Sequence, residues 1–219
     1  MCGRFALFDK SKLEAKYGVK VGPSLELPDR YNVAPRSTVP VVTAEGIELM
    51  NWGLLPFYAK DPAKDRRFIN AKAETVGELT TFKRSFVERR CVIPANGFYE
   101  WKETPEGKVP YYFFPKDNGL FSLAGIYEVR PDAEGKDYKT FAIITTEPNL
   151  QVGEVHDRMP VILARDEEDQ WLNPDVIEAE HLTPLLHRYP DEFMGSYAVS
   201  PLVGNTRNEG AELIKPLTE

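Results

Sequence analysis

Residues 90–103 read "RCVIPANGFYEWKE", and this stretch, rich in apolar, β-branched and aromatic residues, indicates the fold class. Three further runs of the same kind follow it: "VPYYFFP" (109–115), "LFSLAGIYEV" (120–129) and "YKTFAIITTE" (138–147). The segments between them are turn signals: "TPEGK" (104–108), "KDNG" (116–119) and "PDAEGKD" (131–137). The pattern therefore predicts a meander of antiparallel strands.

Shorter elements surround this meander. The sequence predicts a helix over 9–18 that starts near Asp9 or Ser11 and ends at Gly18, a hairpin over 37–54, and a helix over 73–90. It also predicts a strand running into a helix over 161–173, a helix broken near Pro184 within 176–189, and a last strand within 195–205. No repeat, low-complexity tract or linker interrupts the chain, so residues 1–219 are expected to form a single α+β domain with a mostly antiparallel, barrel-like β core flanked by short helices.

The charge distribution bears on the class of partner. A net charge of -7 argues against a uniformly basic nucleic-acid binder. Residues 60–90 nevertheless carry more Lys and Arg than Asp and Glu, so the sequence fits either a basic face on an acidic body or a solvated surface of mixed charge. No apolar run of about 18 residues and no signal peptide is present, and we expect a soluble, cytoplasmic protein without membrane contact.

Cysteine and histidine are scarce. The only cysteines are Cys2 and Cys91, and with three histidines they show no close ligand spacing. We therefore expect no disulfide, no metal and no cofactor.

Cys2 stands directly behind the initiator methionine. Removal of Met1 would give it a free α-amine beside its thiol, a 1,2-aminothiol. Because an α-amine has a reference pKa of about 7.7–8.0, a useful fraction is neutral at pH 7. The amine can attack an aldehyde to form an imine, and the thiol can close on the imine carbon to form a thiazolidine. The structural alternative is a buried small apolar residue near a strand start.

Three other polar residues interrupt apolar patterns. Glu100 lies among Phe98, Tyr99 and Trp101, surroundings that raise a carboxyl pKa towards the range of general acid-base catalysis, unless it simply points to solvent. His156 has Asp157 and Arg158 beside it and is either functional or a capping or surface residue. Asn70 could orient an amine or thiol, although an asparagine there, taken alone, is more often a turn or cap residue.

Taken together, the motifs resemble a known family. In chain order they are "MCGRF" (1–5), "RYNVAPRSTVPVV" (30–42), "NWGLLP" (51–56), "FINAKAET" (68–75), "RCVIPANGFYEWK" (90–102), "LAGIYE" (123–128), "VHDRMPVIL" (155–163) and "VSPLVGNTRNEGAELIKP" (199–216). They resemble the SOS-response-associated peptidase (SRAP) family, in its bacterial branch, nearly end to end.

The resemblance implies a protein that recognises abasic sites in single-stranded DNA and forms a covalent thiazolidine DNA-protein crosslink, which shields the lesion during the DNA damage response. It implies Cys2 as nucleophile, Asn70 as the residue that positions the amine and thiol, and Glu100 as proton shuttle. His156 would open the deoxyribose ring to its aldehyde form. A monomer, associated with the nucleoid when bound to damaged DNA, is expected.

The DNA contacts that the resemblance implies are Arg4, Pro35, Phe57, Tyr58, Lys72 and Thr145. Basic residues would contact phosphates, and Phe57 and Tyr58 would stack on bases beside the lesion. The chain departs from the family pattern in two segments. Phe57 and Tyr58 stand where tryptophan is frequent, and Lys72 stands where arginine is common, which keeps the charge but loses the bidentate fork.

Three other functions fit parts of the sequence. One is a cysteine-type peptidase that removes its own Met1 through Cys2, with or without a lyase activity on abasic DNA. Another is a glutamine amidotransferase, because "MCG" also opens that class of N-terminal-nucleophile enzymes, but no second domain is present to use the ammonia. The third is a reader of single-stranded or modified DNA that binds without a covalent bond.

Overall fold

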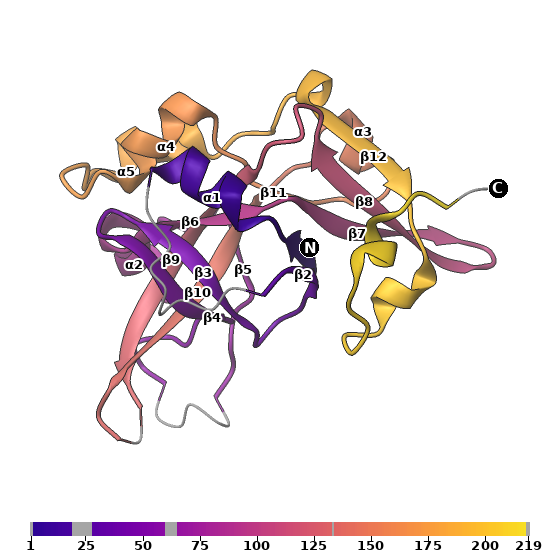
Figure 1. The fold of residues 1–219 in the computed structure, drawn as a ribbon. Coiled ribbons are helices and arrows are strands. Elements are labelled where there is room, and N and C mark those ends of the chain that lie inside the picture. The colour runs from indigo at the N-terminus through magenta and orange to yellow at the C-terminus, as the bar shows by residue number, and fades with distance from the viewer. Residues whose placement is uncertain (1, 19–27, 60–64, 133, 218–219) are drawn as a thin grey trace.

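In the computed structural model, the described residues are 2–18, 28–59, 65–132 and 134–217 (Figure 1). They form the predicted α+β fold, and its centre is a closed barrel of five strands in the order β10-β4-β3-β6-β9, with β9 pairing back to β10. Only the β4–β10 pair within the barrel is parallel. The strands are β3 (Thr38–Thr43), β4 (Gly46–Trp52), β6 (Arg90–Ala95), β9 (Phe121–Pro131) and β10 (Asp137–Thr146).

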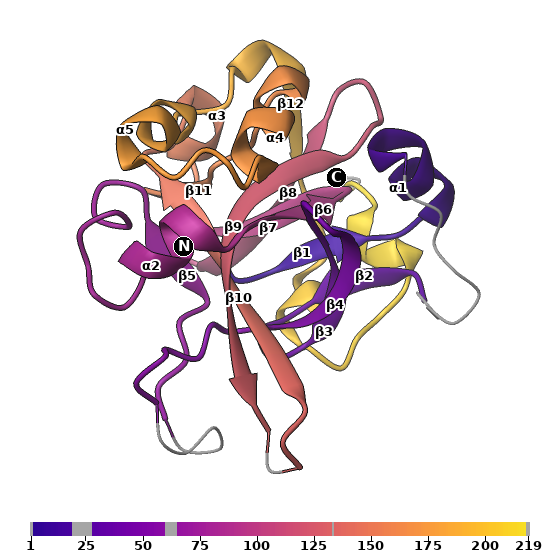
Figure 2. The same cartoon turned by 90° about the vertical axis from the view of Figure 1, so that its left-hand side faces the viewer.

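A second sheet packs beside the barrel. Its five strands are antiparallel in the order β12-β8-β7-β1-β2. Figure 1 shows this sheet to one side of the barrel, and Figure 2 shows the β9–β10 hairpin extending below the rest of the barrel. The bounds are β1 (Phe5–Leu7), β2 (Arg30–Val33), β7 (Gly97–Thr104), β8 (Gly107–Pro115) and β12 (Met194–Ala198).

The stretch 90–103 connects the two sheets. It is not one strand, because β6 ends at Ala95 and β7 begins at Gly97, with Asn96 at the crossing. The Asn96 N–H donates to the carbonyl of Ala6 (2.8 Å), and its Oδ1 accepts from the N–H of Phe8 (2.7 Å). A Cβ at position 97 would lie 2.4 Å from the carbonyl oxygen of Phe113, so only glycine allows β7 to approach β8 this closely.

Most of the other predicted elements are confirmed. The hairpin is β3–β4, and α1 (Lys10–Tyr17) ends at Gly18, whose φ of 64° is left-handed. The broken helix is α5 (Ala179–Leu182) followed by the 3-10 turn η1 (Thr183–Leu185). The remaining elements are α3 (Leu150–Gly153), β11 (Met159–Pro160), α4 (Arg165–Leu172), η2 (Asp191–Phe193), η3 (Pro201–Gly204) and η4 (Ala211–Ile214).

The predicted helix over 73–90 was wrong in length. Only α2 (Lys83–Glu88) is helical, and residues 73–82 form successive turns. These turns bury Val76 and Phe82 but leave Leu79 48% exposed, so the helical spacing was partly coincidental. Gly77 and the threonine pair at 80–81 have low helix propensity, which favours turns.

Three apolar clusters hold the fold together. One fills the barrel interior and continues to the near face of the five-stranded sheet; it includes Cys2, Trp52 and Phe98. Another lies under α2 and α4 on the outside of the barrel, around Phe86 and Trp171. The last lies on the far face of the five-stranded sheet, where η3 and η4 cover it. Cys2 therefore lies where the barrel and the five-stranded sheet meet.

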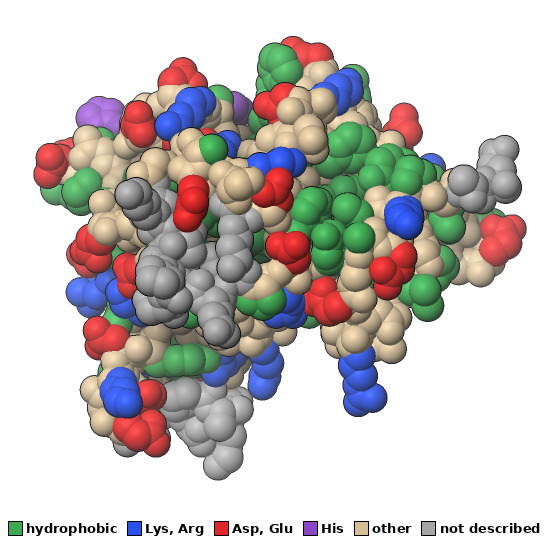
Figure 3. Space-filling view, in the orientation of Figure 1, with side chains coloured by type: hydrophobic (Ala, Val, Ile, Leu, Met, Phe, Trp, Pro, Cys, Tyr) green, Lys and Arg blue, Asp and Glu red, His purple; other side chains and the backbone are tan. Residues whose placement is uncertain are grey.

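The described residues contain no helix long and apolar enough to span a membrane and no group of three or more His, Cys, Asp or Glu that could hold a metal ion. On the face shown in Figure 3, acidic and basic side chains are interspersed. Lys60 and Lys64, part of the basic stretch noted in the sequence, lie outside the described residues.

Candidate functional site

Cys2 is fully buried between the barrel and the five-stranded sheet. Burial raises the pKa of its thiol, and the nearby Glu100 carboxylate raises it further. The thiol is therefore held in its neutral form. Met1, whose removal would expose the amine of Cys2, lies outside the described residues.

The Glu100 side chain lies on the same side of the five-stranded sheet as Cys2, as the alternation of side chains along β7 requires. Phe98 belongs to the cluster that contains Cys2, and Tyr99 belongs to the cluster on the far face. Because side chains alternate along a strand, Glu100 returns to the side of Cys2. It is 3% exposed, and desolvation raises its pKa from 4.5 to about 7. This excludes the solvent-facing alternative and makes Glu100 a carboxyl that can both give and take a proton near neutral pH.

His156 approaches from the segment after α3, where its N–H donates to the carbonyl of Val152 (2.8 Å). Its Nε2 lies 3.8 Å from Oε2 of Glu100, and its side chain is 26% exposed. The backbone N–H of Arg158 donates to Nδ1 (3.0 Å), which in the neutral ring places the proton on Nε2, towards Glu100. Desolvation lowers the pKa of His156.

Asn70 begins β5 (Asn70–Lys72), a short strand parallel to β10. Its Nδ2 makes a long contact of 3.5 Å with the carbonyl of Ile143, and its Oδ1 is buried without a hydrogen-bond partner among the described residues. A buried amide oxygen without a partner is costly unless something else binds it. Asn70 thus has an acceptor available for an N–H or S–H donor.

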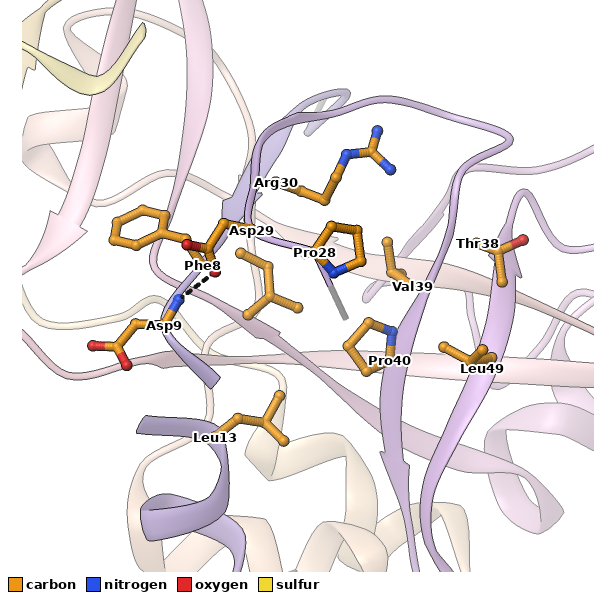
Figure 4. A pocket seen from close by; sticks show the side chains of 11 residues that line it. Phe8, Asp9, Leu13, Pro28, Asp29, Arg30, Thr38, Val39, Pro40 and Leu49 are labelled. Atoms are coloured by element: carbon orange, nitrogen blue, oxygen red, sulfur yellow. Dashed lines mark hydrogen bonds between the residues drawn. The ribbon is translucent and has the colours of Figure 1, made fainter. Parts of the chain in front are cut away.

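Glu100 and His156 line one pocket of about 580 Å³, together with Arg4, Trp101, Glu103, Lys108, Val155, Asp157 and Gly204. Asn70 is not among its lining residues. A separate apolar hollow, drawn in Figure 4, lies between β1, α1 and the β3–β4 hairpin, where the N–H of Asp9 donates to Asp29 (3.1 Å). None of the predicted catalytic residues lines that hollow, whereas Glu100 and His156 both line the pocket described above.

Comparison with known proteins places this geometry in a family. The model of the SOS response associated peptidase (SRAP) family matches residues 1–206. The chain belongs to the SRAP family. It is 39% identical to the abasic site processing protein YoqW of Bacillus subtilis, covering 98% of this chain and 99% of that protein. It is 29% identical to the abasic site processing protein YedK of Escherichia coli, covering 99% and 100% of the two chains.

A solved structure agrees with the fold of this SRAP protein. A protein from Bacteroides thetaiotaomicron superposes with a TM-score of 0.89 at 29% identity, covering 99% of this chain and 100% of that one. The predicted fold class, including a barrel-like core with short helices, is thereby confirmed.

In the SRAP protein, two of the predicted DNA contacts lie side by side on the β5–β10 pair. Lys72 is exposed and stands directly opposite Thr145. Thr145 itself is fully buried, and its carbonyl accepts from the N–H of Ala73 (2.8 Å). The exposed cation at this edge is therefore Lys72, and a side-chain contact from Thr145 to DNA would require its neighbours to move.

The two aromatic residues predicted to stack on bases are exposed at the surface. Phe57 and Tyr58 are 40% and 53% exposed, with ring centroids 5.2 Å apart at 81°. The Tyr58 hydroxyl lies 3.0 Å from that of Thr81. Pro35 is half-buried in a turn closed by Ser37 N–H to Ala34 carbonyl (3.1 Å).

Arg4 is held by protein groups. Its Nη1 donates to Oδ1 of Asn32 and to the carbonyl of Val203, both at 2.7 Å, and its guanidinium lies 5.8 Å from the Trp101 ring centroid. Arg4 therefore ties β2 to η3, whose Gly204 lines the pocket. Any phosphate contact from Arg4 would add to this structural role.

Arg158 is an organising residue that sequence reasoning named only as a neighbour of His156. It forms a bidentate pair with Glu74 (2.6 and 2.9 Å) and donates to the carbonyl of Thr145 (2.5 Å). It thereby joins the loop that carries His156 to the end of β5 and to β10. In the sequence, the only indication of this ion pair was an Arg in the motif "HDRMP" and a Glu in the motif "NAKAET".

Proposed function

We propose that this SRAP protein recognises abasic sites in single-stranded DNA and forms a covalent thiazolidine crosslink through Cys2 after Met1 is removed. The observation that carries the proposal is the approach of Glu100 and His156 to within 3.8 Å of each other in an open pocket, beside a buried Cys2. Relatives named abasic site processing proteins supply the class of substrate.

The covalent step needs no group beyond those of the chain and the lesion. The neutral α-amine of Cys2 attacks C1′ of the open-chain sugar, the carbinolamine loses water, and an imine results. The thiol then adds across the C=N bond, with its proton passing to the nitrogen. One water leaves in total, and the five-membered ring contains both the sulfur and the nitrogen of Cys2.

Glu100 supports the dehydration. With a pKa of about 7 it protonates the departing hydroxyl of the carbinolamine and can take a proton back from the thiol. Asn70 offers its unpartnered Oδ1 to the amine or thiol. A thiol kept neutral by burial requires such a base, because the thiolate is the nucleophilic form.

His156 acts before this step. An abasic sugar is mostly a closed hemiacetal, and opening it requires a proton for the ring oxygen and loss of the hydroxyl proton at C1′. The imidazole lines the pocket and is 26% exposed, so it can exchange protons with both solvent and substrate. The proposal therefore gives ring opening to His156 and imine chemistry to Glu100.

The thiol protects the DNA strand. An imine at C1′ acidifies the C2′ hydrogens and promotes β-elimination, whereas the thiazolidine has no C=N bond. A Cys2→Ala protein that retains the free α-amine should therefore form no stable crosslink and should cleave more abasic strands than the wild type.

The test is the intact mass of the purified protein before and after incubation with a single-stranded oligonucleotide carrying one abasic site. The spectrum without DNA reports whether Met1 is absent. A denaturation-resistant peak at the mass of protein plus oligonucleotide minus one water, lost in Cys2→Ala, supports the proposal. If protein lacking Met1 gives no such peak, the crosslinking mechanism fails and a peptidase or a non-covalent reader takes its place.

A further inference from the structure

Asp157 stands beside the proposed ring-opening histidine. Its Oδ1 lies 3.0 Å from Nδ1 of His156, its side chain is 88% exposed, and it lines the Glu100–His156 pocket. An acidic residue in a pocket proposed to receive DNA works against binding, because it repels the phosphates. A carboxylate at this place in the pocket is therefore expected to have a role other than DNA binding.

The contacts of Nδ1 differ between the two protonation states of His156. In the neutral ring, Nδ1 accepts the N–H of Arg158, and the proton sits on Nε2. In the imidazolium, Nδ1 carries a proton that can point at the Asp157 carboxylate. Asp157 thus stabilises only the protonated ring, the form that can donate to the ring oxygen of the sugar.

Other charges around His156 act in both directions. Glu100 on β7 lies across the ring, and Lys108 on β8 lowers the pKa of His156, as does burial. Asp157 raises the pKa of His156 and also that of Glu100. Among the described residues, one exposed carboxylate therefore favours the acid form of both groups.

We propose that Asp157 is a positioning residue that holds the His156 imidazolium for ring opening, at the expense of some affinity for DNA. The proposal rests on the function proposed above. It implies that loss of the carboxylate slows the reaction while it leaves binding of the strand intact or strengthens it. A side chain with a merely structural role would weaken both.

The test compares Asp157→Asn with wild type and with Glu154→Gln, which removes an exposed carboxylate three residues earlier. Crosslinking rates are measured with an abasic oligonucleotide from pH 5.5 to 8.5, and binding is measured with an oligonucleotide carrying tetrahydrofuran, an analogue that cannot open. We expect Asp157→Asn to be about 5- to 10-fold slower at pH 7.5 and near the wild-type rate at pH 5.5, with unchanged or tighter tetrahydrofuran binding. Glu154→Gln should follow the wild-type pH profile.

A second readout is the NMR titration of the His156 ring, assigned with a His156→Gln protein, which should shift to lower pH in Asp157→Asn. An unshifted titration, or a rate loss that is equal at every pH and accompanied by weaker tetrahydrofuran binding, overturns the role of Asp157. If the wild type itself forms no crosslink, the proposed function fails and the inference fails with it. If the wild type crosslinks and Asp157→Asn matches it throughout, only the inference fails.

Discussion

Glu100 and His156 face each other at 3.8 Å, and desolvation moves their pKa values in opposite directions: up to about 7 for the carboxyl and down for the imidazole. Near neutral pH Glu100 therefore exchanges its proton readily, and a small change in either environment alters how protons are shared between the two groups. Two groups this close titrate as a pair, so the apparent pKa values in a pH-rate profile belong to the pair and not to either residue alone.

Replacing Glu100 by Gln should slow crosslinking about 100-fold at pH 7, because the amide cannot exchange a proton with the carbinolamine. The wild-type rate should change near pH 7, whereas the variant should lose that inflection. Rates from denaturing gels across pH 5–9 check this. If the rate of the Glu100→Gln protein still changes near pH 7, the inflection belongs to another group.

The same substitution should stabilise the fold at high pH. The pKa of Glu100 is higher in the folded than in the unfolded chain, so the folded state binds the proton more tightly and loses stability as pH rises from about 4.5 to about 7. Gln carries no charge, and the variant should be more stable than wild type by up to about 3 kcal/mol at pH 8. At pH 4 the difference should vanish. Urea unfolding at the two pH values measures this, and an equal difference at both would show that the effect is not the charge.

The β-rich fold class was predictable because it rests on local patterns. Strands such as 120–129 and 138–147 are long apolar runs bounded by turn residues, and the hairpin over 37–54 is a local contact. The Asn-Gly pair in "PANGF" is a turn signal inside an apolar run, but that this turn carries the chain from one sheet to the other follows only from tertiary contacts to Ala6 and Phe113. The helix over 73–90 failed for a similar reason: buried positions at a helical spacing also arise from a chain of turns packed on the barrel.

The site was predictable in part. Alternation within "GFYEW" indicates that Glu100 and Phe98 share a face, but which face contains Cys2 depends on the pairing of β1 with β7. The approach of His156 to Glu100 joins residues 56 positions apart, a relation that no local pattern encodes. Roles for these residues were available from the family motifs, whereas their burial and protonation required the fold.

Phe57 and Tyr58 should contribute to binding of single strands. Substituting either by Ala should weaken binding of a tetrahydrofuran oligonucleotide by about 1–3 kcal/mol, because each ring is exposed and available to a base. Tyr58→Phe keeps the ring, loses the contact with Thr81 and should bind nearly as wild type. Fluorescence anisotropy at fixed salt measures these affinities. Wild-type affinity in the Phe57→Ala, Tyr58→Ala double variant would place the strand elsewhere.

Lys72 should contribute one phosphate contact. Lys72→Ala should weaken binding and reduce the slope of log affinity against log salt concentration by about 0.7, the value for one phosphate on a single strand. Lys72→Arg should keep the slope and bind as tightly or more tightly, since the guanidinium can form a bidentate pair. A Lys72→Ala slope equal to that of the wild type would show that Lys72 does not contact the backbone.

Replacing Gly97, beside the crossing between the two sheets, should lower the stability of the fold. A methyl group at position 97 would lie 2.4 Å from the Phe113 carbonyl oxygen and 2.5 Å from the Tyr112 ring, so β7 and β8 would have to separate. We expect Gly97→Ala to destabilise the fold by about 3 kcal/mol. Gly153→Ala is the control, because its methyl would meet only Pro148 at ordinary contact distance. Urea unfolding of both variants measures this: a selective loss of stability in Gly97→Ala would show that the close approach of β7 to β8 supports the fold, and equal stabilities would mean that the two strands can separate there without cost.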